Sequence, residues 1–138
     1  MTVSQQEWSN RFFVLLSGIF IASLVASNLI FQKFIAWDVW LPIIGNYTFE
    51  LSVGILPYPI TFLVTDIISE IYGRKKADQV VVSGFIASIF IMGIVLIADA
   101  APATVWSPVD NTLFTKVFGL FGPAVFASMT AYLTAQFI

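Results

Sequence analysis

The sequence predicts an all-α, polytopic membrane protein, a helix bundle whose chain crosses the bilayer four times. Hydrophobic residues make up 59% of the 138 positions and charged residues only 10%, whereas a soluble domain carries about 25% charged residues. Too few charges are present to cover a water-facing surface, and the mean hydropathy of +0.93 agrees with a chain that lies in lipid. Four long apolar stretches, separated by short polar segments, predict the four crossings.

The composition also excludes several kinds of function. The chain has no cysteine and no histidine, which removes disulfides, thiolate nucleophiles, imidazole bases and the common zinc sites. Neither Gly-x-Gly-x-x-Gly nor Gly-x-x-x-x-Gly-Lys-Ser/Thr occurs, so the chain carries neither of these nucleotide-binding loops. No basic patch with interleaved aromatic residues is present. We therefore expect no cofactor, no metal and no nucleic-acid partner.

The first predicted span covers residues 12–35. At about 1.5 Å per residue this stretch is long enough to cross a hydrocarbon core of about 30 Å. A cleaved signal peptide is the alternative, because Arg11 precedes the apolar run. The run nevertheless continues through Phe31 and is too long for the apolar region of such a peptide. We expect the segment after it, with Trp37 and Trp40, to be a loop at the membrane interface.

Three further spans are predicted at residues 49–72, 80–98 and 119–138. The loop after the second span is short and basic, and the segment before the fourth is polar and contains prolines. The fourth span is expected to be broken near Gly122-Pro123, because proline interrupts helices. Ile138 ends the chain inside an apolar stretch, so we expect the 138 residues to be part of a longer membrane protein.

The charges indicate the orientation in the membrane. The basic side carries Arg11, Arg74, Lys75 and Lys76. The loops of the opposite side carry Asp38, Asp99 and Asp110, with Lys33 and Lys116 close to the helix ends. Because short basic loops stay in the cytoplasm, we expect a cytoplasmic N-terminus and a multi-pass protein of the cell inner membrane.

Small residues recur at helical spacing and predict close helix–helix packing in lipid. They are Gly18, Ala22 and Ala26 in the first span, Gly84 and Ser88 in the third, and Ala127, Ala131 and Ala135 in the fourth.

Two polar features are harder to explain by packing. Asn28 lies two-thirds along the first span, where its amide needs hydrogen-bond partners. Both an interhelical hydrogen bond and a ligand contact are open for it. Ser128, Tyr132 and Gln136 share one face of the fourth span, which favours a helix that lines a cavity. The alternative is that these side chains bond only to their own backbone.

Two carboxylates one helical turn apart, Asp66 and Glu70, are the strongest candidates for a binding site. An acidic group at the centre of a membrane helix costs roughly 2.5 to 3.5 kcal/mol, so something must compensate for it. Glu70 could instead reach the basic interface or pair with Arg74. Asp66 lies a turn deeper, and Pro57 and Pro59 are expected to open backbone carbonyls nearby. Together they predict a polar pocket that opens toward the cytoplasm.

A long motif begins at Thr61 and reads Thr-Phe-Leu-x-Thr-Asp-x-x-x-Glu-x-Tyr-Gly-Arg-Lys. With Ala-Ser-Asn ending at Asn28 and Ala-Tyr-x-x-Ala-Gln ending at Gln136, it resembles the queuosine precursor transporter family of bacterial vitamin-uptake-type membrane proteins. The resemblance covers nearly the whole chain. It implies six spans in the full protein and uptake of the 7-deazaguanine bases preQ0 or preQ1 across the inner membrane.

The positions that match this family are Asn28, Asp66, Glu70 and Gln136. A guanine-like base presents a ring N–H and an exocyclic amine, and a carboxylate such as Asp66 or Glu70 can accept from both. The same charge would compensate a cationic aminomethyl group. We hypothesise that Asn28 and Gln136 read the carbonyl and ring nitrogens. In addition, Phe62 or Tyr132 would stack on the base.

Other functions fit the residues less well. The chain could be the substrate-binding subunit of an ATP-driven complex, or a non-catalytic assembly subunit whose polar groups only hold helices together. An intramembrane aspartyl protease would need two facing aspartates, and only Asp66 lies within a span. We therefore expect no enzyme. We expect a membrane transporter for a small nucleobase-like substrate, and the sequence leaves a homo-oligomer open.

Overall fold

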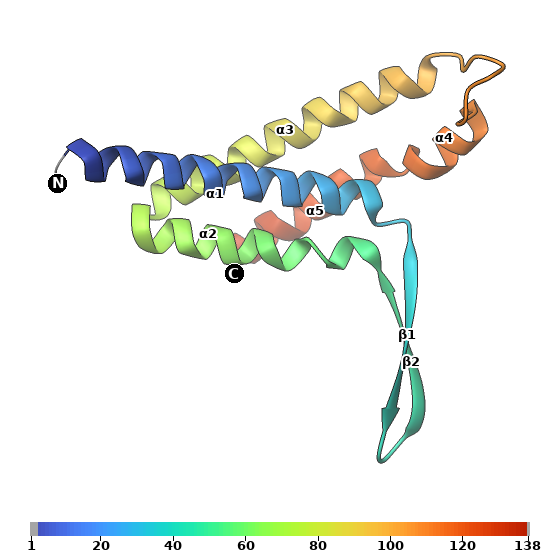
Figure 1. The fold of residues 1–138 in the computed structure, drawn as a ribbon, viewed down its shortest axis with the longest axis horizontal. Helices are drawn as coiled ribbons and strands as arrows, with labels where there is room; N and C mark the ends of the chain where they lie inside the picture. Colours follow the sequence, from blue (N-terminus) through green and yellow to red (C-terminus); the bar gives the residue numbers. More distant parts are fainter. Residues whose placement is uncertain (1–2, 138) are drawn as a thin grey trace.

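The computed structural model describes residues 3–137 of the chain, and its side chains up to Ala135. The elements in chain order are α1 Val3–Ile30, β1 Phe34–Leu41, β2 Gly45–Ser52, the short 3-10 helix η1 Val53–Ile55, α2 Tyr58–Tyr72, α3 Arg74–Ala100, α4 Asn111–Phe118 and α5 Phe121–Phe137. Figure 1 shows α1, α2, α3 and α5 side by side, with the β1–β2 hairpin projecting from one end.

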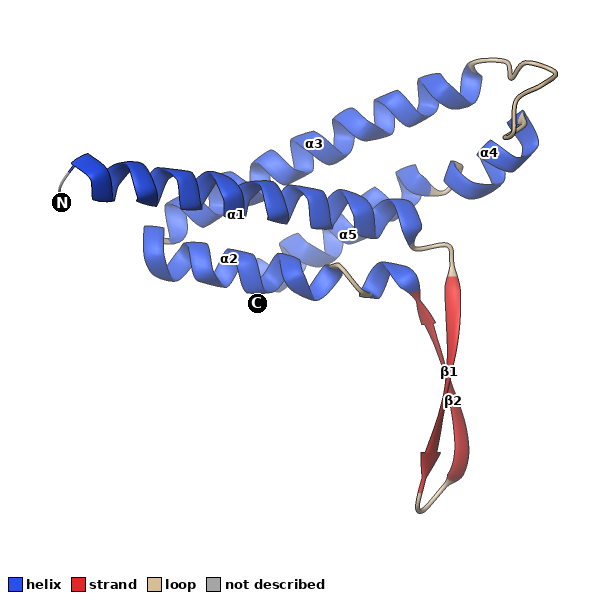
Figure 2. Ribbon diagram, viewed as in Figure 1, coloured by secondary structure: helices blue, strands red, loops and turns tan. Residues whose placement is uncertain are grey.

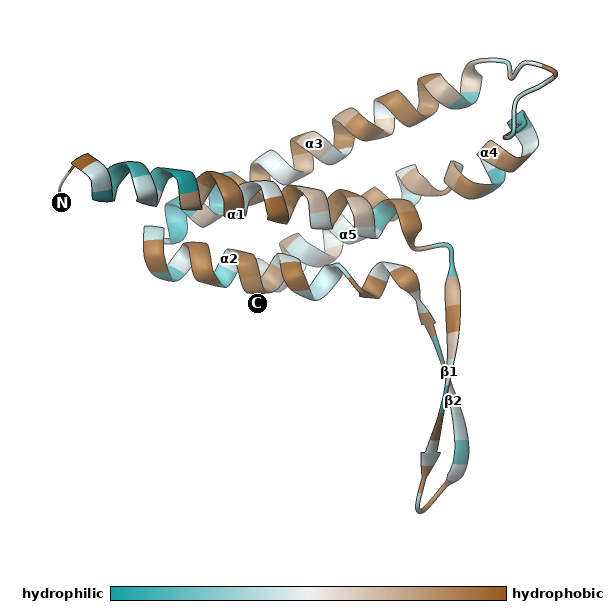
Figure 3. Cartoon of the chain, viewed as in Figure 1, coloured by the Kyte–Doolittle hydropathy of each residue, from teal (hydrophilic) through white to brown (hydrophobic). Residues whose placement is uncertain are grey.

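The described residues contain four helical segments long and apolar enough to cross a membrane: Val3–Ile30, Val53–Tyr72, Arg74–Ala100 and Asn111–Ala135. The predicted all-α membrane bundle with four spans is thereby confirmed. Figure 3 shows hydrophobic residues along most of these helices, whereas the N-terminal end of α1 is hydrophilic. Helix α1 contacts α2, α3 and α5, so it holds the bundle together.

The segment expected to be a tryptophan-containing loop is instead a β-hairpin (Figure 2). Strands β1 and β2 pair antiparallel from Phe34–Ser52 to Leu41–Gly45. Alternating aromatic and β-branched residues favour a strand. A three-residue loop, residues 42–44, leads into Gly45, whose φ of 83° suits a short hairpin connection. Because strands take these residues, α1 ends at Ile30 rather than 35, and no helix begins at 49.

The two prolines of the second span start a helix rather than interrupt one. Pro57 is the residue before α2 and Pro59 lies in its first turn, where the missing N–H has no helical partner to lose. The carbonyl of Val53 accepts from the Leu56 amide at 3.0 Å, and that of Pro57 accepts from the Ile60 amide at 3.2 Å. Of the two carbonyls that lie four residues before these prolines, that of Val53 is therefore engaged rather than open.

The break in the fourth span lies earlier than expected. Helix α4 ends at Phe118 and α5 begins at Phe121, so Pro123 falls in the first turn of α5, where it is tolerated. The Asp110 side chain caps α4 by accepting from the Leu113 amide at 2.7 Å.

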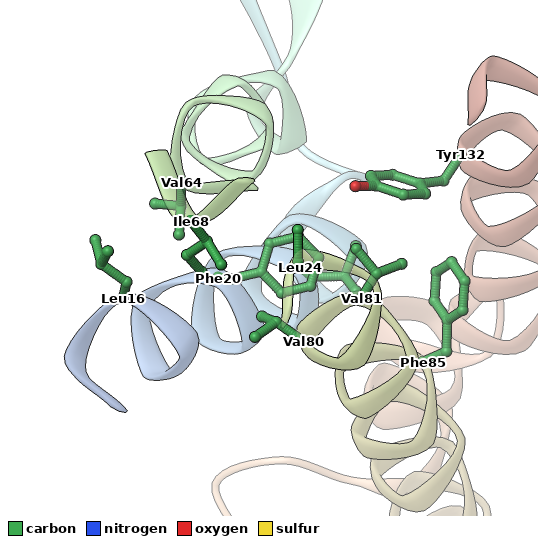
Figure 4. Packing of buried hydrophobic residues seen from close by; sticks show 10 residues of the cluster. Leu16, Phe20, Leu24, Val64, Ile68, Val80, Val81, Phe85 and Tyr132 are labelled. Carbon is green, nitrogen blue, oxygen red and sulfur yellow. The ribbon is translucent and has the colours of Figure 1, made fainter. Parts of the chain in front are cut away.

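The apolar core gathers around Phe20, which is fully buried. Figure 4 shows Phe20 and Leu24 of α1 between side chains of α2 and α3, and Tyr132 reaching in from α5. A Cβ added at Gly84 would come within 2.6 Å of the Phe20 ring. Glycine at 84 therefore allows α1 and α3 to approach closely, as the small-residue pattern of the third span predicts.

The small residues of the other two spans do not form such seams within the described bundle. A Cβ added at Gly18 would meet no atom within 4 Å, and Ala22 is exposed. On α5, Ala127, Ala131 and Ala135 are all exposed. Helix α1 instead packs through its larger residues, because Phe20 and Leu24 bury more apolar area than an alanine stripe could.

Candidate functional site

A polar cavity of about 290 Å³ opens between α2, the start of α3 and the end of α5. We call it the Asp66 cavity. Its lining residues are Phe62, Thr65, Asp66, Ser69, Arg74, Ala77, Asp78, Val81, Tyr132 and Ala135. They come from three helices, and the side chains of α2 face those of α3 and α5 across the opening.

The hydroxyl groups near Asp66 are largely used by their own helix. Thr61 donates to the Tyr58 carbonyl at 2.6 Å, and Thr65 donates to the carbonyls of Thr61 and Phe62 at 3.0 and 2.9 Å. Asp66 itself is exposed in the cavity. Among the described residues, none donates a hydrogen bond to it. Its carboxylate is therefore available to a ligand.

The Tyr-Gly-Arg part of the motif forms the junction between α2 and α3. The Tyr72 hydroxyl donates to the Ser9 carbonyl at 2.7 Å, and its ring meets Phe13 edge-on at 5.2 Å, which fixes α2 to α1. Gly73 has a φ of 85° and a ψ of 159°, a conformation essentially restricted to glycine. This turn starts α3 at Arg74, so that Arg74 lines the Asp66 cavity.

Acidic groups outnumber basic ones around the cavity. Asp66 and Asp78 line it with Arg74 as the cation. In the described part of the chain no carboxylate lies within 4.0 Å of a lysine or arginine nitrogen, so Arg74 does not pair with Glu70. The net charge of the lining favours a ligand that offers hydrogen-bond donors or positive charge.

An aromatic pair forms part of the wall of this cavity. The rings of Phe62 and Tyr132 stack with their centroids 5.9 Å apart and an interplanar angle of 14°. Phe20 and Phe85 meet Tyr132 edge-on at 6.4 and 5.8 Å. Figure 4 shows the Tyr132 ring extending from α5 toward Val81. Both predicted stacking residues therefore stand on the wall of one cavity.

Asn28 lies in a different place. It lines a second open cavity of about 380 Å³, the Asn28 cavity, at the hairpin end of the bundle. The lining residues are Ser27, Asn28, Phe31, Ser52, Gly54, Ile55, Tyr58, Ala124, Ala127 and Ser128. Asn28 is only 6% exposed, and its Nδ2 has no hydrogen-bond partner among the described residues.

The predicted site is thus only partly assembled. Phe62, Asp66 and Tyr132 share the Asp66 cavity, whereas Glu70 is exposed and does not line it. The side chain of Gln136 lies outside the described residues. Asp78 was not among the predicted residues, because a loop was expected there. Gly73 could have indicated Asp78 from the sequence. A helix that starts directly after this glycine puts Arg74 and Asp78 on one face at i, i+4.

Four segments long and apolar enough to cross a membrane, three of which line a polar cavity, define a multi-pass membrane protein. Residues 52–138, more than half of the chain, match a family described as "Putative vitamin uptake transporter". The chain belongs to this family of transporters. The match spans every residue of the Asp66 cavity but excludes α1 and Asn28. No curated protein and no solved structure matches the chain.

Proposed function

We propose that the protein takes up queuosine precursors, the 7-deazaguanine bases preQ0 and preQ1, across the bacterial inner membrane, and that Asp66 recognises the base. The observation that carries the proposal is the unpartnered Asp66 carboxylate in a cavity that also presents an aromatic pair. A carboxylate without a partner is costly in a membrane helix, and a ligand with hydrogen-bond donors would compensate for that cost.

The hydrogen-bonding chemistry of these bases suits the cavity. Their guanine-like edge offers a ring N–H and an exocyclic amine, which can both donate to the two oxygens of Asp66. Asp78 adds a second negative charge to the lining, which would compensate the aminomethyl cation of preQ1. The family resemblance of the motif from Thr61 to Lys75 supports the same class of substrate.

The shape of the cavity supports a planar ligand. A base beside Asp66 would stack on the exposed part of Phe62, whose ring is already aligned with that of Tyr132. Stacking of a base on an aromatic side chain contributes about 1–3 kcal/mol. The volume of about 290 Å³ lies just below the roughly 300–1,000 Å³ of small-molecule sites. A single base fits this range better than a nucleotide.

The orientation completes the proposal. The basic residues beside the cavity, Arg74, Lys75 and Lys76, put this end of the bundle in the cytoplasm by the positive-inside rule. The Asp66 cavity is then the inner, cytoplasmic binding site, and the hairpin lies outside the cell. A base bound at Asp66 is close to release into the cytoplasm.

Uptake of radiolabelled preQ1 by cells that express the full-length protein tests the proposal. We expect Asp66→Asn to lower uptake at least tenfold, because an amide can no longer accept from two donors at once or compensate a charge. Glu70→Gln is the matched control, since it makes the same chemical change one turn along α2 but outside the cavity. It should keep near-normal uptake.

Competition identifies the substrate. Unlabelled preQ0 should compete with preQ1, whereas an unrelated vitamin should not. If no saturable uptake of either base is found while the protein is present in the membrane, the substrate assignment is wrong. Equal uptake by the Asp66→Asn variant and the unmodified protein would reject the role of Asp66 alone.

A further inference from the structure

We propose that the Asn28 cavity is a second, outer binding station for the same ligand, and that the stacked Phe62–Tyr132 pair is the barrier between the two stations. This inference rests on the proposed function. It adds a route through the protein, with a distinct ligand contact at its outer end, to the single site at Asp66.

The two cavities lie in series along the same two helices. On the α2 side, Tyr58 lines the outer cavity and Asp66 the inner one. These residues are eight positions apart, which corresponds to about 12 Å along a helix. On α5, Ser128 lines the outer cavity and Tyr132 the inner one, one turn later. Both helices therefore run from the outer station to the inner one.

The aromatic pair stands at the boundary on both helices. Phe62 is one turn from Tyr58 and one turn from Asp66, and its ring stacks on Tyr132 at 5.9 Å. The Tyr58 ring meets Phe62 edge-on at 5.5 Å, so aromatic faces continue from the outer cavity to the inner one. A planar base can pass such a barrier by exchanging one stacking partner for the next, whereas a hydrated ion cannot stack.

The outer station has a different chemistry from the inner one. The Ser27 hydroxyl donates to the Gly54 carbonyl at 2.6 Å, and the Ser128 hydroxyl donates to the Val125 carbonyl at 3.0 Å. The amide of Asn28 has no such partner among the described residues. An uncharged amide is both donor and acceptor. It therefore suits the carbonyl and adjacent N–H edge of a base, whereas Asp66 suits the amine.

These 138 residues contain no cysteine, so a direct test needs only that any cysteine outside them be replaced by serine. Three single-cysteine variants of the full-length protein report on the two cavities and on a control position. Ser128→Cys lies in the outer cavity and Ser69→Cys in the inner one. Asn46→Cys is the control, because Asn46 is exposed in the hairpin and lines neither cavity.

Labelling by a membrane-impermeant thiol reagent is measured in permeabilised cells, where the reagent reaches both ends of the bundle, in the presence and absence of preQ1. We expect preQ1 to slow labelling at least threefold at Ser128→Cys and at Ser69→Cys, and to leave Asn46→Cys unchanged. Adding Asp66→Asn should remove the protection at Ser69→Cys only, and adding Asn28→Leu should remove that at Ser128→Cys only. Joint loss of both protections in either double variant would overturn the two-station proposal.

The failure of this inference can be told from failure of the proposed function. Protection of Ser69→Cys without protection of Ser128→Cys, together with normal uptake, rejects the outer station and leaves the transport function intact. Protection of neither cysteine, together with no saturable uptake, rejects both.

The barrier is tested by the side from which the reagent arrives. With the aromatic pair intact, the outside reagent should reach Ser128→Cys but not Ser69→Cys. Phe62→Ala should let it reach Ser69→Cys, whereas Phe62→Tyr, which keeps the ring, should not. Equal labelling of Ser69→Cys from both sides in the presence of Phe62 would show that the pair is no barrier.

A second inference comes from the hairpin alone. We infer that β1 and β2 lie on the outward-facing surface of the membrane that the helices cross, with one face of the hairpin in lipid. Directly paired residues point to the same face of a hairpin, and the faces alternate along each strand. The register therefore collects Ile35, Trp37, Val39, Tyr47, Phe49 and Leu51 on one face. Asp38, Asn46, Thr48 and Glu50 lie on the other, with Trp40 among them.

The phospholipid interface is the occupant that fits this face. The hairpin projects from the bundle roughly perpendicular to the helices (Figure 1). When the helices cross the membrane, the hairpin therefore runs along the membrane surface. Its apolar face then continues the lipid-facing surface of the spans, where tryptophan and tyrosine are favoured. A two-stranded hairpin is only marginally stable alone, and Trp37 is 65% exposed.

Trp37 and Trp40 form a matched pair for the test, because they lie on opposite faces of one strand. Variants of the full-length protein keep one of these tryptophans and replace the others by phenylalanine. In liposomes of phosphatidylcholine with brominated acyl chains, we expect at least twofold stronger fluorescence quenching of Trp37 than of Trp40. Equal quenching of the two tryptophans would overturn the inference. An unquenched Trp37 in a protein that crosslinks as a dimer would also overturn it, because a second copy would then cover this face instead of lipid.

Discussion

Asp66 lies in an apolar helix, where the surrounding residues give it an opening rather than a hydrogen-bond partner. The nearby threonine hydroxyls bond to carbonyls of their own helix, and Arg74 stands across the cavity without forming an ion pair with any carboxylate described. A structural carboxylate would be expected to have at least one close donor. This arrangement supports the binding role that we propose for Asp66.

Asp78 should tune the preference between the two bases. Asp78→Asn removes one of the two negative charges that line the Asp66 cavity. The loss weakens the attraction for a cationic ligand by about 1 kcal/mol at an intermediate effective dielectric constant. We therefore expect preQ1 uptake to fall several-fold while uptake of the neutral preQ0 changes little. The ratio of the two uptake rates is the measurement, and an equal fall for both bases would contradict the charge effect.

The packing at Gly84 gives a stability prediction at the scale of one residue. A methyl group there would lie 2.6 Å from the Phe20 ring, so Gly84→Ala should push α1 and α3 apart and destabilise the fold by about 1–3 kcal/mol. Gly93→Ala is the matched control on the same helix, because nothing lies within 4 Å of the added Cβ. Thermal unfolding in detergent compares them, and equal melting temperatures would contradict the predicted contact.

At the scale of elements, the junction between α2 and α3 decides what faces the cavity. Tyr72 fixes the end of α2 to α1 through Ser9, and the turn at Gly73 sends α3 back beside it. Helix α2 thus brings Asp66 to the cavity from one side while α3 brings Arg74 and Asp78 from the other. A short basic stretch that looks like a loop in the sequence is in fact the first turn of a helix.

Gly73→Ala should disturb this junction. A side chain at a φ of 85° and a ψ of 159° is strained, typically by about 1–3 kcal/mol, and relief of the strain would turn Arg74 out of the cavity. We expect a lower melting temperature and a several-fold loss of preQ1 uptake. Gly18→Ala, at an uncrowded helical position, should change neither, and the two measurements together separate strain from a general effect of glycine replacement.

At the scale of the whole molecule, the orientation can be checked with the same thiol chemistry. The positive-inside rule puts Lys75 in the cytoplasm and the hairpin, with Asn46, outside. An impermeant thiol reagent added to intact cells should label Asn46→Cys, and it should label Lys75→Cys only after the membrane is permeabilised. The reverse pattern would invert the topology and would make the Asp66 cavity the outer site.

Much of the architecture follows from local sequence patterns. Apolar runs long enough to cross a bilayer predict the four spans, and the i, i+4 spacing puts Phe62 and Asp66 on one face of α2, where both line one cavity. The hairpin was missed because its alternating residues lie next to apolar helical segments, so the period of two is hidden by the general hydrophobicity. Gly84 and Gly18 look alike in the sequence, yet only Gly84 faces another helix.

The sequence by itself determined that this protein lies in a membrane and how often the described chain crosses it, and it limited the candidate carboxylates of the polar region to Asp66 and Glu70. These properties depend on hydrophobicity and helical periodicity, which act over neighbouring residues. Only the tertiary structure decided that Asn28 lies in a separate cavity, that Tyr132 stacks on Phe62 and that Asp78 faces the site of Asp66. Those relations join helices far apart in the chain, and they are set by how bulky side chains such as Phe20 and small ones such as Gly84 allow the helices to pack.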